Sequence, residues 1–169
     1  MDKEQLVVSE LKNPQGKKLD YVMNNLSEQE VEEIRLLLKE VGLRCTSARL
    51  TVIQELKDAA TPVTHAELAD KLVPLGFDKA TVFRNLVDLA EVGLLRRIEL
   101  GDHVWRFEWI AREVDADEHP HFLCTVCGEV ACLRDLALEI PKLTSVDHFG
   151  EVTEILLKGQ CTKCLAPAG

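Results

Sequence analysis

Two Cys-x-x-Cys pairs constrain the fold of this chain more than any other feature. Cys124 and Cys127 form the first pair, Cys161 and Cys164 form the second, and 33 residues lie between the pairs. Each pair can place two sulfur atoms on one tight turn, and two such turns can close the tetrahedral sulfur cage of a structural zinc site. We expect such a cage to hold the fold together rather than to catalyse, because it has no open coordination position.

Three other interpretations of these cysteines stay open. They are an iron ion on the same four sulfur atoms, four buried thiols without a metal, and a redox-active pair. A disulfide framework is disfavoured, because the N-terminus is polar and lacks the apolar segment of a secretion signal. We therefore expect a cytoplasmic chain whose thiols stay reduced.

Length and composition exclude several classes of protein. The 169 residues suit one or two small domains, and 46% hydrophobic and 29% charged residues exclude a mostly disordered chain. The longest apolar runs have three or four residues, so no segment is expected to span a membrane. The net charge of −9 disfavours broad non-specific binding of nucleic acid but permits a local basic face.

Four segments in the first half of the chain carry the same helix-start pattern, in which apolar residues flank a capping side chain. The predicted caps are Ser27, Thr46, Thr64 and Asp78. Gly42 and Gly93 stand where the first and the fourth helix would end. The sequence therefore predicts four short helices between residues 27 and 93.

The periodicity changes after Gly93. Residues 94–100 and 103–110 read as two strands around Gly101-Asp102, a Gly-first pair that suits a two-residue type II′ turn. Short helices followed by a hairpin are the layout of a winged helix-turn-helix.

An acid-rich stretch at residues 111–118 predicts a hinge linker and a domain boundary. We expect an extension at 1–25, a winged-helix domain at 26–110 and a smaller α/β domain at 119–169, which together make an α+β chain. Short strands are predicted at 119–124, 129–133 and 151–160, whereas 134–148 reads equally as a strand or a short helix.

A second group of metal-binding residue types precedes the first cysteine pair. His119 and His121 alternate, so on a strand both imidazoles would lie on one face and could bind a second metal ion. Further candidate ligands are Glu108, Cys132 and, more weakly, His103, His65 and His148. Each also has an ordinary interpretation, as a solvated side chain or, for Cys132, as the filling of a strand. Cys45 reads as an apolar flank of the second helix cap rather than a ligand.

Five motifs, in this order and spacing, resemble the ferric uptake regulator (Fur) family over roughly residues 27–165. The motifs are GLRCTSAR at 42–49, ATVFRNL at 80–86, RFE at 106–108, HPHFLCTVCG at 119–128 and GQCTKC at 159–164.

The resemblance implies a homodimeric, metal-dependent repressor of metal homeostasis that binds double-stranded operator DNA. It implies no enzymatic activity, no small-molecule substrate and no association with a membrane. The winged helix would bind DNA, and the second domain would dimerise and hold structural zinc on the two cysteine pairs. A regulatory metal ion, Zn²⁺ or Fe²⁺, would lie between the domains on His119, His121 and Glu108, and we predict Cys132 as a further ligand.

The chain departs from the family pattern at several ligand positions. Pro62 stands where the family often has a histidine, and Cys132 stands where it often has a carboxylate. A thiolate is a softer ligand than a carboxylate and favours zinc over manganese. Pro120 and Thr153 occupy ligand positions of a third site that some members have.

The predicted recognition helix spans residues 79–92. The predicted DNA contacts are Lys79, Thr81, Phe83, Arg84, Asn85 and Arg49. Arg84 and Lys79 could meet phosphates or guanine, and Asn85 could read adenine. Phe83 would touch a thymine methyl group or, alternatively, pack at the edge of the domain core. Arg96 and Arg97 alternate along the wing, so that one of the two at most can face DNA.

Two other function classes compete with this interpretation. A zinc-ribbon module that binds protein, as a transcription accessory factor, would need the cysteine pairs but not the capped helices and the wing. A thiol oxidoreductase would use one Cys-x-x-Cys, but no thioredoxin-like strand–helix–strand pattern flanks either pair.

Overall fold

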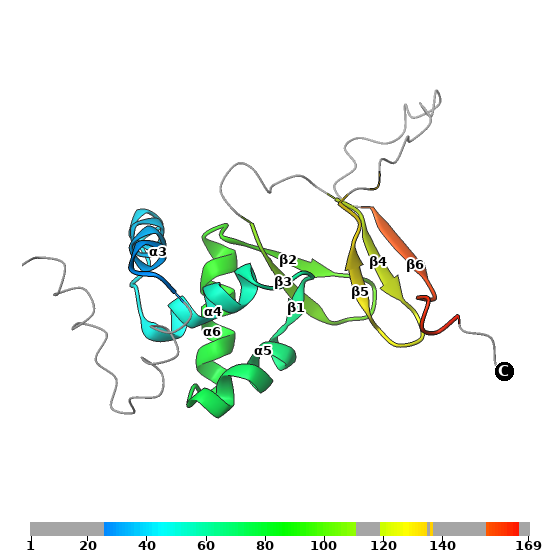
Figure 1. Cartoon of the computed structure of the whole chain (residues 1–169), viewed down its shortest axis with the longest axis horizontal. Coiled ribbons are helices and arrows are strands. Elements are labelled where there is room, and N and C mark those ends of the chain that lie inside the picture. Colours follow the sequence, from blue (N-terminus) through cyan, green and yellow to red (C-terminus); the bar gives the residue numbers. More distant parts are fainter. Residues whose placement is uncertain (1–25, 111–118, 135, 137–154, 166–169) are drawn as a thin grey trace, which may run out of the picture.

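The computed structural model describes residues 26–110, 119–134, 136 and 155–165 of the chain. Helices gather at one end of the molecule and a three-stranded sheet lies at the other, with a hairpin between them (Figure 1). The predicted extension at 1–25, the hinge at 111–118 and nearly all of the ambiguous segment 134–148 lie outside the described residues. No helix in the described part of the chain is long and apolar enough to cross a membrane.

The four predicted helices are confirmed, and each begins at its predicted cap. Ser27 and Thr64 form complete capping boxes with Glu30 and Glu67, while Thr46 and Asp78 accept hydrogen bonds from backbone N–H groups three residues on. The helices are α3 (Glu28–Glu40), α4 (Ser47–Lys57), α5 (His65–Leu72) and α6 (Lys79–Glu91), and a short 3₁₀ turn, η1 (Val73–Leu75), follows α5. Gly42 and Gly93 have positive φ angles of 77° and 75°, which explains the two helix ends.

One apolar core holds these helices together. Leu38 of α3, Leu50 and Ile53 of α4, Leu72 of α5 and Leu86 of α6 are each fully or almost fully buried in it. The buried residues of α3 and α6 repeat at helical spacing, whereas α4 is buried along most of its length and lies at the centre of the helical core.

The hairpin belongs to a three-stranded sheet with the order β1-β3-β2. Its strands are β1 (Val63–Thr64), β2 (Leu95–Glu99) and β3 (Trp105–Trp109), all antiparallel to their neighbours. The sequence did not predict β1, because two residues are too few to show an alternation. The three helices α4, α5 and α6 with this sheet form the predicted winged helix-turn-helix.

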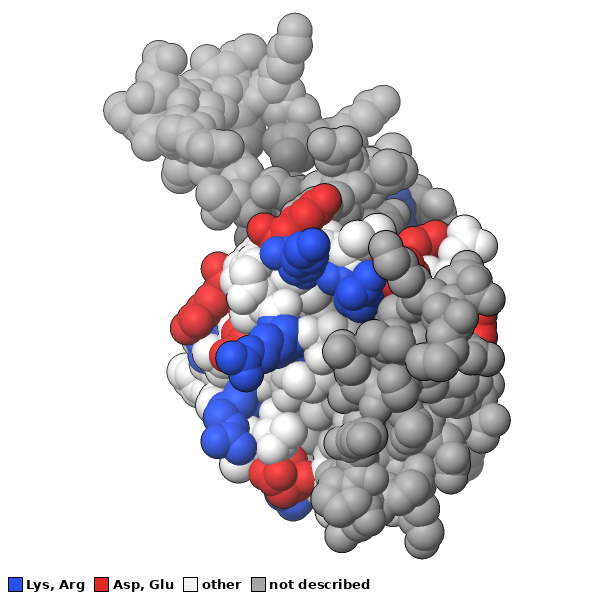
Figure 2. Space-filling view, turned by 90° about the vertical axis from the view of Figure 1, so that its left-hand side faces the viewer, with Lys and Arg blue, Asp and Glu red and all other residues white. Residues whose placement is uncertain are grey.

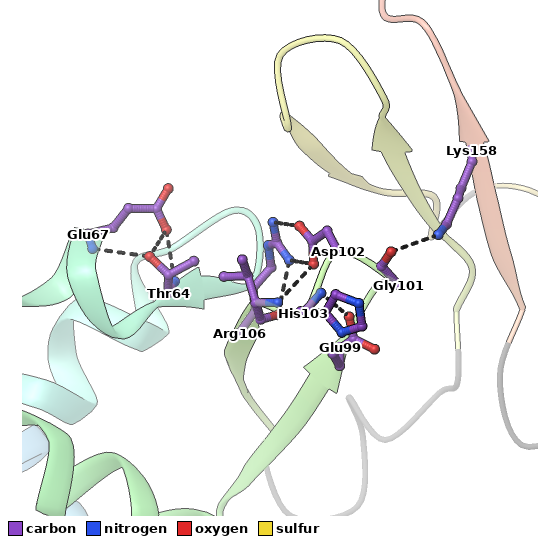
Figure 3. A network of polar contacts seen from close by, with 9 residues as sticks. Thr64, Glu67, Glu99, Gly101, Asp102, His103, Arg106 and Lys158 are labelled. Atoms are coloured by element: carbon purple, nitrogen blue, oxygen red, sulfur yellow. Dashed lines mark hydrogen bonds and ion pairs between the residues drawn. The ribbon is translucent and has the colours of Figure 1, made fainter.

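The prediction of a two-residue type II′ turn in the wing is wrong. Glu99 pairs with Trp105, so five residues, 100–104, make the loop. The Asp102 carboxylate accepts hydrogen bonds from the Val104 backbone N–H and from both terminal nitrogens of Arg106, and the Glu99 carboxylate accepts one from the His103 N–H at 2.6 Å (Figure 3). These side-chain contacts stabilise a longer loop in which His103 also takes a positive φ, of 60°.

The two faces of the hairpin lie against different domains. Phe107 packs into the helical core, whereas Ile98 and Leu100 are buried with Leu123 of the second domain, next to Val130 and Leu156. Lys158 also donates a hydrogen bond to the Gly101 carbonyl at 3.4 Å, which ties the wing loop to the second sheet (Figure 3). Because side chains alternate along a strand, Glu108 lies on the face opposite Phe107 and so faces the second domain.

The second sheet has the order β5-β4-β6. Its strands are β4 (His121–Cys124), β5 (Val130–Cys132) and β6 (Leu156–Gly159), which confirms the three strand predictions within the described residues. β4 runs antiparallel to β5 but parallel to β6. The parallel pair ends at the same edge, with Cys124 opposite Gly159, and this register brings together the two cysteine pairs.

Candidate functional site

The four paired cysteines meet beyond the ends of β4 and β6. The sulfur atoms of Cys124, Cys127, Cys161 and Cys164 all lie within 4.8 Å of one another. The Thr125 N–H donates to the Gly159 carbonyl at 2.8 Å, so a backbone contact already joins the two turns. The predicted convergence of the two pairs is therefore present in the fold, and a four-thiol donor set suits zinc.

Hydrogen bonds make the four thiols unequal. Backbone N–H groups, first that of Cys127 and then that of Cys161, lower the pKa of the Cys124 thiol to about 6. Side-chain hydrogen bonds with Cys127 and Cys161 raise the pKa of Cys164 to about 12. Four thiols packed this closely cannot all ionise by themselves, so full deprotonation calls for a cation at their centre.

A second cluster joins the two domains. Glu108 of β3, His119 just before β4, His121 at the start of β4 and Cys132 at the end of β5 each offer one ligand atom. These atoms lie within 4.8 Å of one another. The Glu108 carboxylate is 3.4 Å from Nε2 of His119, 3.8 Å from Nε2 of His121 and 4.0 Å from Sγ of Cys132. The structure thus brings together all four residues that the sequence singled out for a second metal site.

Burial changes the pKa values of two residues in this cluster. Desolvation, followed by the charges of His119, Arg96 and Arg134, lowers the pKa of His121 to about 4, so its imidazole is neutral at pH 7. Burial, followed by the Glu108 carboxylate, raises the pKa of the Cys132 thiol. A neutral imidazole has a lone pair to donate, whereas the thiol has to lose its proton when it binds a metal.

Two buried polar atoms in this cluster test whether a metal ion fits. Nε2 of His121 and Oε2 of Glu108 make no hydrogen bond to any described residue. Buried polar atoms are almost always paired, and a metal ion held by both would satisfy them. Two nitrogens, one carboxylate and one thiol form a donor set that zinc accepts.

Two arginines beside Glu108 were not predicted as part of this site. Arg134 donates a hydrogen bond to Oε1 of Glu108 at 2.9 Å, and Arg96 lies 3.7 Å from Oε2. From the sequence, Arg96 is expected on the wing and nothing singles out Arg134. The sequence holds a partial signal for both contacts. Arg96 is paired with Glu108 across β2 and β3, so the two side chains share one face of the sheet. Arg134 follows Cys132 by two residues, so it lies close to the cluster along the chain.

The weaker ligand candidates lie elsewhere. His103 is exposed on the wing loop, outside both clusters. Nε2 of His65 lies 3.0 Å from the Lys79 carbonyl oxygen, at the start of α6. Cys45 packs against the helical core, as its interpretation as an apolar flank requires. His148 and Thr153 are outside the described residues.

The predicted DNA contacts divide into exposed and buried groups. Lys79, Phe83 and Arg84 are exposed on α6 and Thr81 is half-buried, whereas Asn85 and Arg49 are buried. Phe83 is 48% exposed and meets His65 edge-on, so it does not pack into the core.

The two buried residues support the helix from within. The Asn85 amide donates to the Thr81 carbonyl at 2.8 Å. Arg49 donates to the Arg44 carbonyl and forms an ion pair with Asp88, which joins α4 to α6. On the face at the helical end of the molecule, the described basic side chains are interspersed with acidic and uncharged ones (Figure 2).

Comparison with known proteins agrees with this architecture. The chain is 25% identical over 126 residues to the peroxide-responsive repressor PerR of Staphylococcus aureus, which covers 73% of this chain and 78% of the relative. The structure of the Vibrio cholerae ferric uptake regulator superposes with a TM-score of 0.60 at 27% identity, over 76% of this chain and 99% of that one. A zinc-bound manganese uptake regulator superposes with a TM-score of 0.61 at 25% identity, over 78% and 98% of the two chains. The ferric uptake regulator family profile itself matches residues 40–154, and on this ground the chain belongs to the ferric uptake regulator family.

Proposed function

We propose that this protein is a homodimeric transcriptional repressor whose binding to operator DNA depends on a metal ion held between its two domains. One observation carries the proposal: Glu108 comes from the winged-helix domain, and His119, His121 and Cys132 come from the second domain, yet their ligand atoms converge. Fur-family proteins are metal-responsive transcriptional regulators, which supports the same conclusion.

The four-cysteine cluster is the proposed structural site. Its zinc would be held by Cys124, Cys127, Cys161 and Cys164, and the closed sulfur shell has no position for a substrate. The turns that carry these residues have little apolar core of their own. Cys127 of the first turn is exposed, and the residues of the second turn are at most half-buried. Metal binding would therefore contribute directly to the stability of this end of the domain.

The cluster around Glu108 is the proposed regulatory site. Its metal ion, Zn²⁺ or Fe²⁺, supplies a positive charge that donors from both domains share. Glu108, His119 and His121 would then restrict the movement of the winged helix relative to the second domain. The Cys132 thiolate favours Zn²⁺, because soft sulfur ligands select zinc over harder cations.

The metal effect on DNA binding follows from linkage. In a dimer, restricted hinges would hold two winged helices at one separation, which would suit half-sites about one DNA turn, roughly 34–36 Å, apart. The winged helix would present Lys79, Thr81, Phe83 and Arg84 to the major groove, with Asn85 and Arg49 supporting α6 from inside the domain. A metal ion that binds this arrangement better than others would favour it, and bound DNA would raise the metal affinity by the same factor.

The two competing functions fit the described residues less well. A zinc-ribbon module that binds protein has no use for a capped recognition helix and a wing. A thiol oxidoreductase needs one accessible thiol pair, whereas here all four sulfur atoms pack together.

A binding experiment tests the proposal. Duplexes selected from a random library in the presence of Zn²⁺ would serve as the operator, and fluorescence anisotropy would measure their affinity with Zn²⁺, Fe²⁺, Mn²⁺ and Ni²⁺. We expect tight, sequence-specific binding with Zn²⁺ or Fe²⁺ that is lost in Glu108→Gln while the four-cysteine zinc stays. Sequence-specific binding that persists unchanged after the second metal is removed would overturn the regulatory role.

A further inference from the structure

The regulatory cluster contains a positive charge that its predicted ligand set does not require. Arg134 lies in the turn after β5 and donates to Oε1 of Glu108 at 2.9 Å. The same oxygen lies 3.4 Å from His119 and 4.0 Å from Cys132. The guanidinium therefore binds the same carboxylate oxygen that His119 and Cys132 approach.

The Glu108 carboxylate is the negative group that both the Arg134 guanidinium and the proposed metal ion would bind. Its side chain is 8% exposed, and two arginines lie beside it, Arg134 at 2.9 Å and Arg96 at 3.7 Å. A buried carboxylate needs such compensation, because burial without a partner is strongly unfavourable. A divalent metal ion would supply the same compensation from the same place.

Charge balance gives the sign of the effect. Metal binding adds two positive charges to the cluster, and Cys132 loses one proton, so the net change is about +1. Arg134 and Arg96 repel that added charge. A nearby arginine therefore lowers the affinity of the cluster for a metal ion, even though it stabilises the carboxylate itself.

We propose that Arg134 is a built-in counter-cation that competes with the regulatory metal for Glu108 and so raises the metal concentration at which the site fills. The inference rests on the proposed regulatory site and adds to it a residue that sets the threshold of the response.

Arg134 suits this role better than Arg96 for two reasons. The Arg134 side chain is 49% exposed, so it can swing into water when a metal ion arrives, whereas that of Arg96 is 26% exposed and is fixed on β2. The Arg134–Glu108 ion pair also crosses the domain interface, as the proposed metal site does. Arg134 would thus join the two domains when metal is scarce, and the metal ion would take over that link when it is abundant.

Zinc titration of matched variants tests the proposal. Wild type, Arg134→Ala, Arg134→Lys and Lys163→Ala would be treated to remove the second metal while the four-cysteine zinc stays, and titrated with Zn²⁺ against a chromogenic chelator. Lys163→Ala is the control, because Lys163 forms an ion pair of equal length, 2.9 Å, with Glu129 beside the other cluster. Co²⁺ spectra of each variant would report whether Cys132 still ligates the metal.

We expect Arg134→Ala to bind the second Zn²⁺ roughly three- to tenfold more tightly than wild type, because one partly exposed charge has been removed. Arg134→Lys should stay near the wild type, Lys163→Ala should match it, and the thiolate-to-Co²⁺ band should be unchanged. A higher salt concentration should reduce the difference in Zn²⁺ affinity between Arg134→Ala and the wild type, because salt screens the charge of the exposed arginine.

The outcomes separate this inference from the proposed function. Two metal ions per chain with equal affinity in wild type and Arg134→Ala, or weaker binding in Arg134→Ala, would overturn the role of Arg134 and leave the regulatory site intact. Equal tightening in Arg134→Lys and Arg134→Ala would refute competition by charge. A second metal ion in neither protein would overturn the regulatory site together with the inference.

Discussion

His121 on β4 lies directly opposite Cys132 on β5 in the antiparallel ladder. Directly opposed residues share one face of a sheet, so the imidazole and the thiol reach the same point from neighbouring strands. His119, two residues before β4 begins, offers its imidazole to the same point, and the wing brings Glu108 to it from the other domain. Strand pairing, and not a loop, therefore places the Cys132 thiol beside the His121 imidazole.

Replacement of Cys132 tests the metal preference of the proposed regulatory site. Cys132→Ser should lower the affinity for Zn²⁺ about tenfold or more and that for Fe²⁺ by less, because an alcohol is a poor substitute for a thiolate. Competition titrations with both metals would measure the two losses. An equal loss of affinity for the two metals, or no loss, would show that Cys132 is not a ligand but a small, half-buried residue of the strand.

Removal of one sulfur from the four-cysteine cluster should affect stability. Cys161→Ser should lose zinc and unfold at a lower temperature, and the dimer should weaken, because the binding energy of such a site is folding energy. Metal analysis, thermal denaturation and sedimentation would measure the three effects. Cys132→Ser is the matched control and should keep its structural zinc; a folded dimeric Cys161→Ser without zinc would refute the structural role.

Replacement of Arg84 tests the recognition helix. Arg84→Ala should weaken binding to the selected duplex by about 1–3 kcal/mol if Arg84 reads a base, or reduce the salt slope by about one if it contacts phosphate. Arg35→Ala on α3, where Arg35 pairs with Glu32 at 2.8 Å, is the control and should bind as wild type. Unchanged affinity at every salt concentration would exclude Arg84 from the interface.

The pKa of His121 predicts how stability depends on pH once the second metal is removed. Its pKa is about 4 in the folded chain against 6.5 in the unfolded chain, so between these values the unfolded state binds more protons. The free energy of unfolding should therefore be unaffected by His121 above pH 6.5 and should decrease as the pH falls from 6.5 toward 4, by up to about 3 kcal/mol. Urea unfolding at several pH values would measure the slope.

A matched variant separates His121 from the other titrating groups. His121→Asn should show a flatter pH dependence than the wild type in the same window. An equal slope in both proteins would assign the pH dependence to other residues.

Local chemistry determined the helices and the fold class. Caps such as Ser27 and Asp78 act on backbone groups within three residues, and apolar residues repeat at helical spacing within α3 and α6, so these signals can be read from short stretches of sequence. The cysteine pairs and the alternating histidines are equally local. The eight predicted metal-ligand residues could therefore be recognised from the sequence, and they come together in two groups of four because β4 pairs with β6 and the wing packs on the second sheet.

Tertiary structure decided what depends on distant partners. The five-residue wing loop depends on contacts of Asp102 and Glu99, and the two-residue strand β1 exists because Val63 and Thr64 pair with β3. Asn85 and Arg49 looked like exposed polar residues, but packing of α6 against α4 buries both. Arg134 reaches Glu108 across 26 residues and a domain interface. A sequence shows which groups can form an ion pair or bind a metal, but which ones meet depends on how two domains pack, and that is a property of the whole chain.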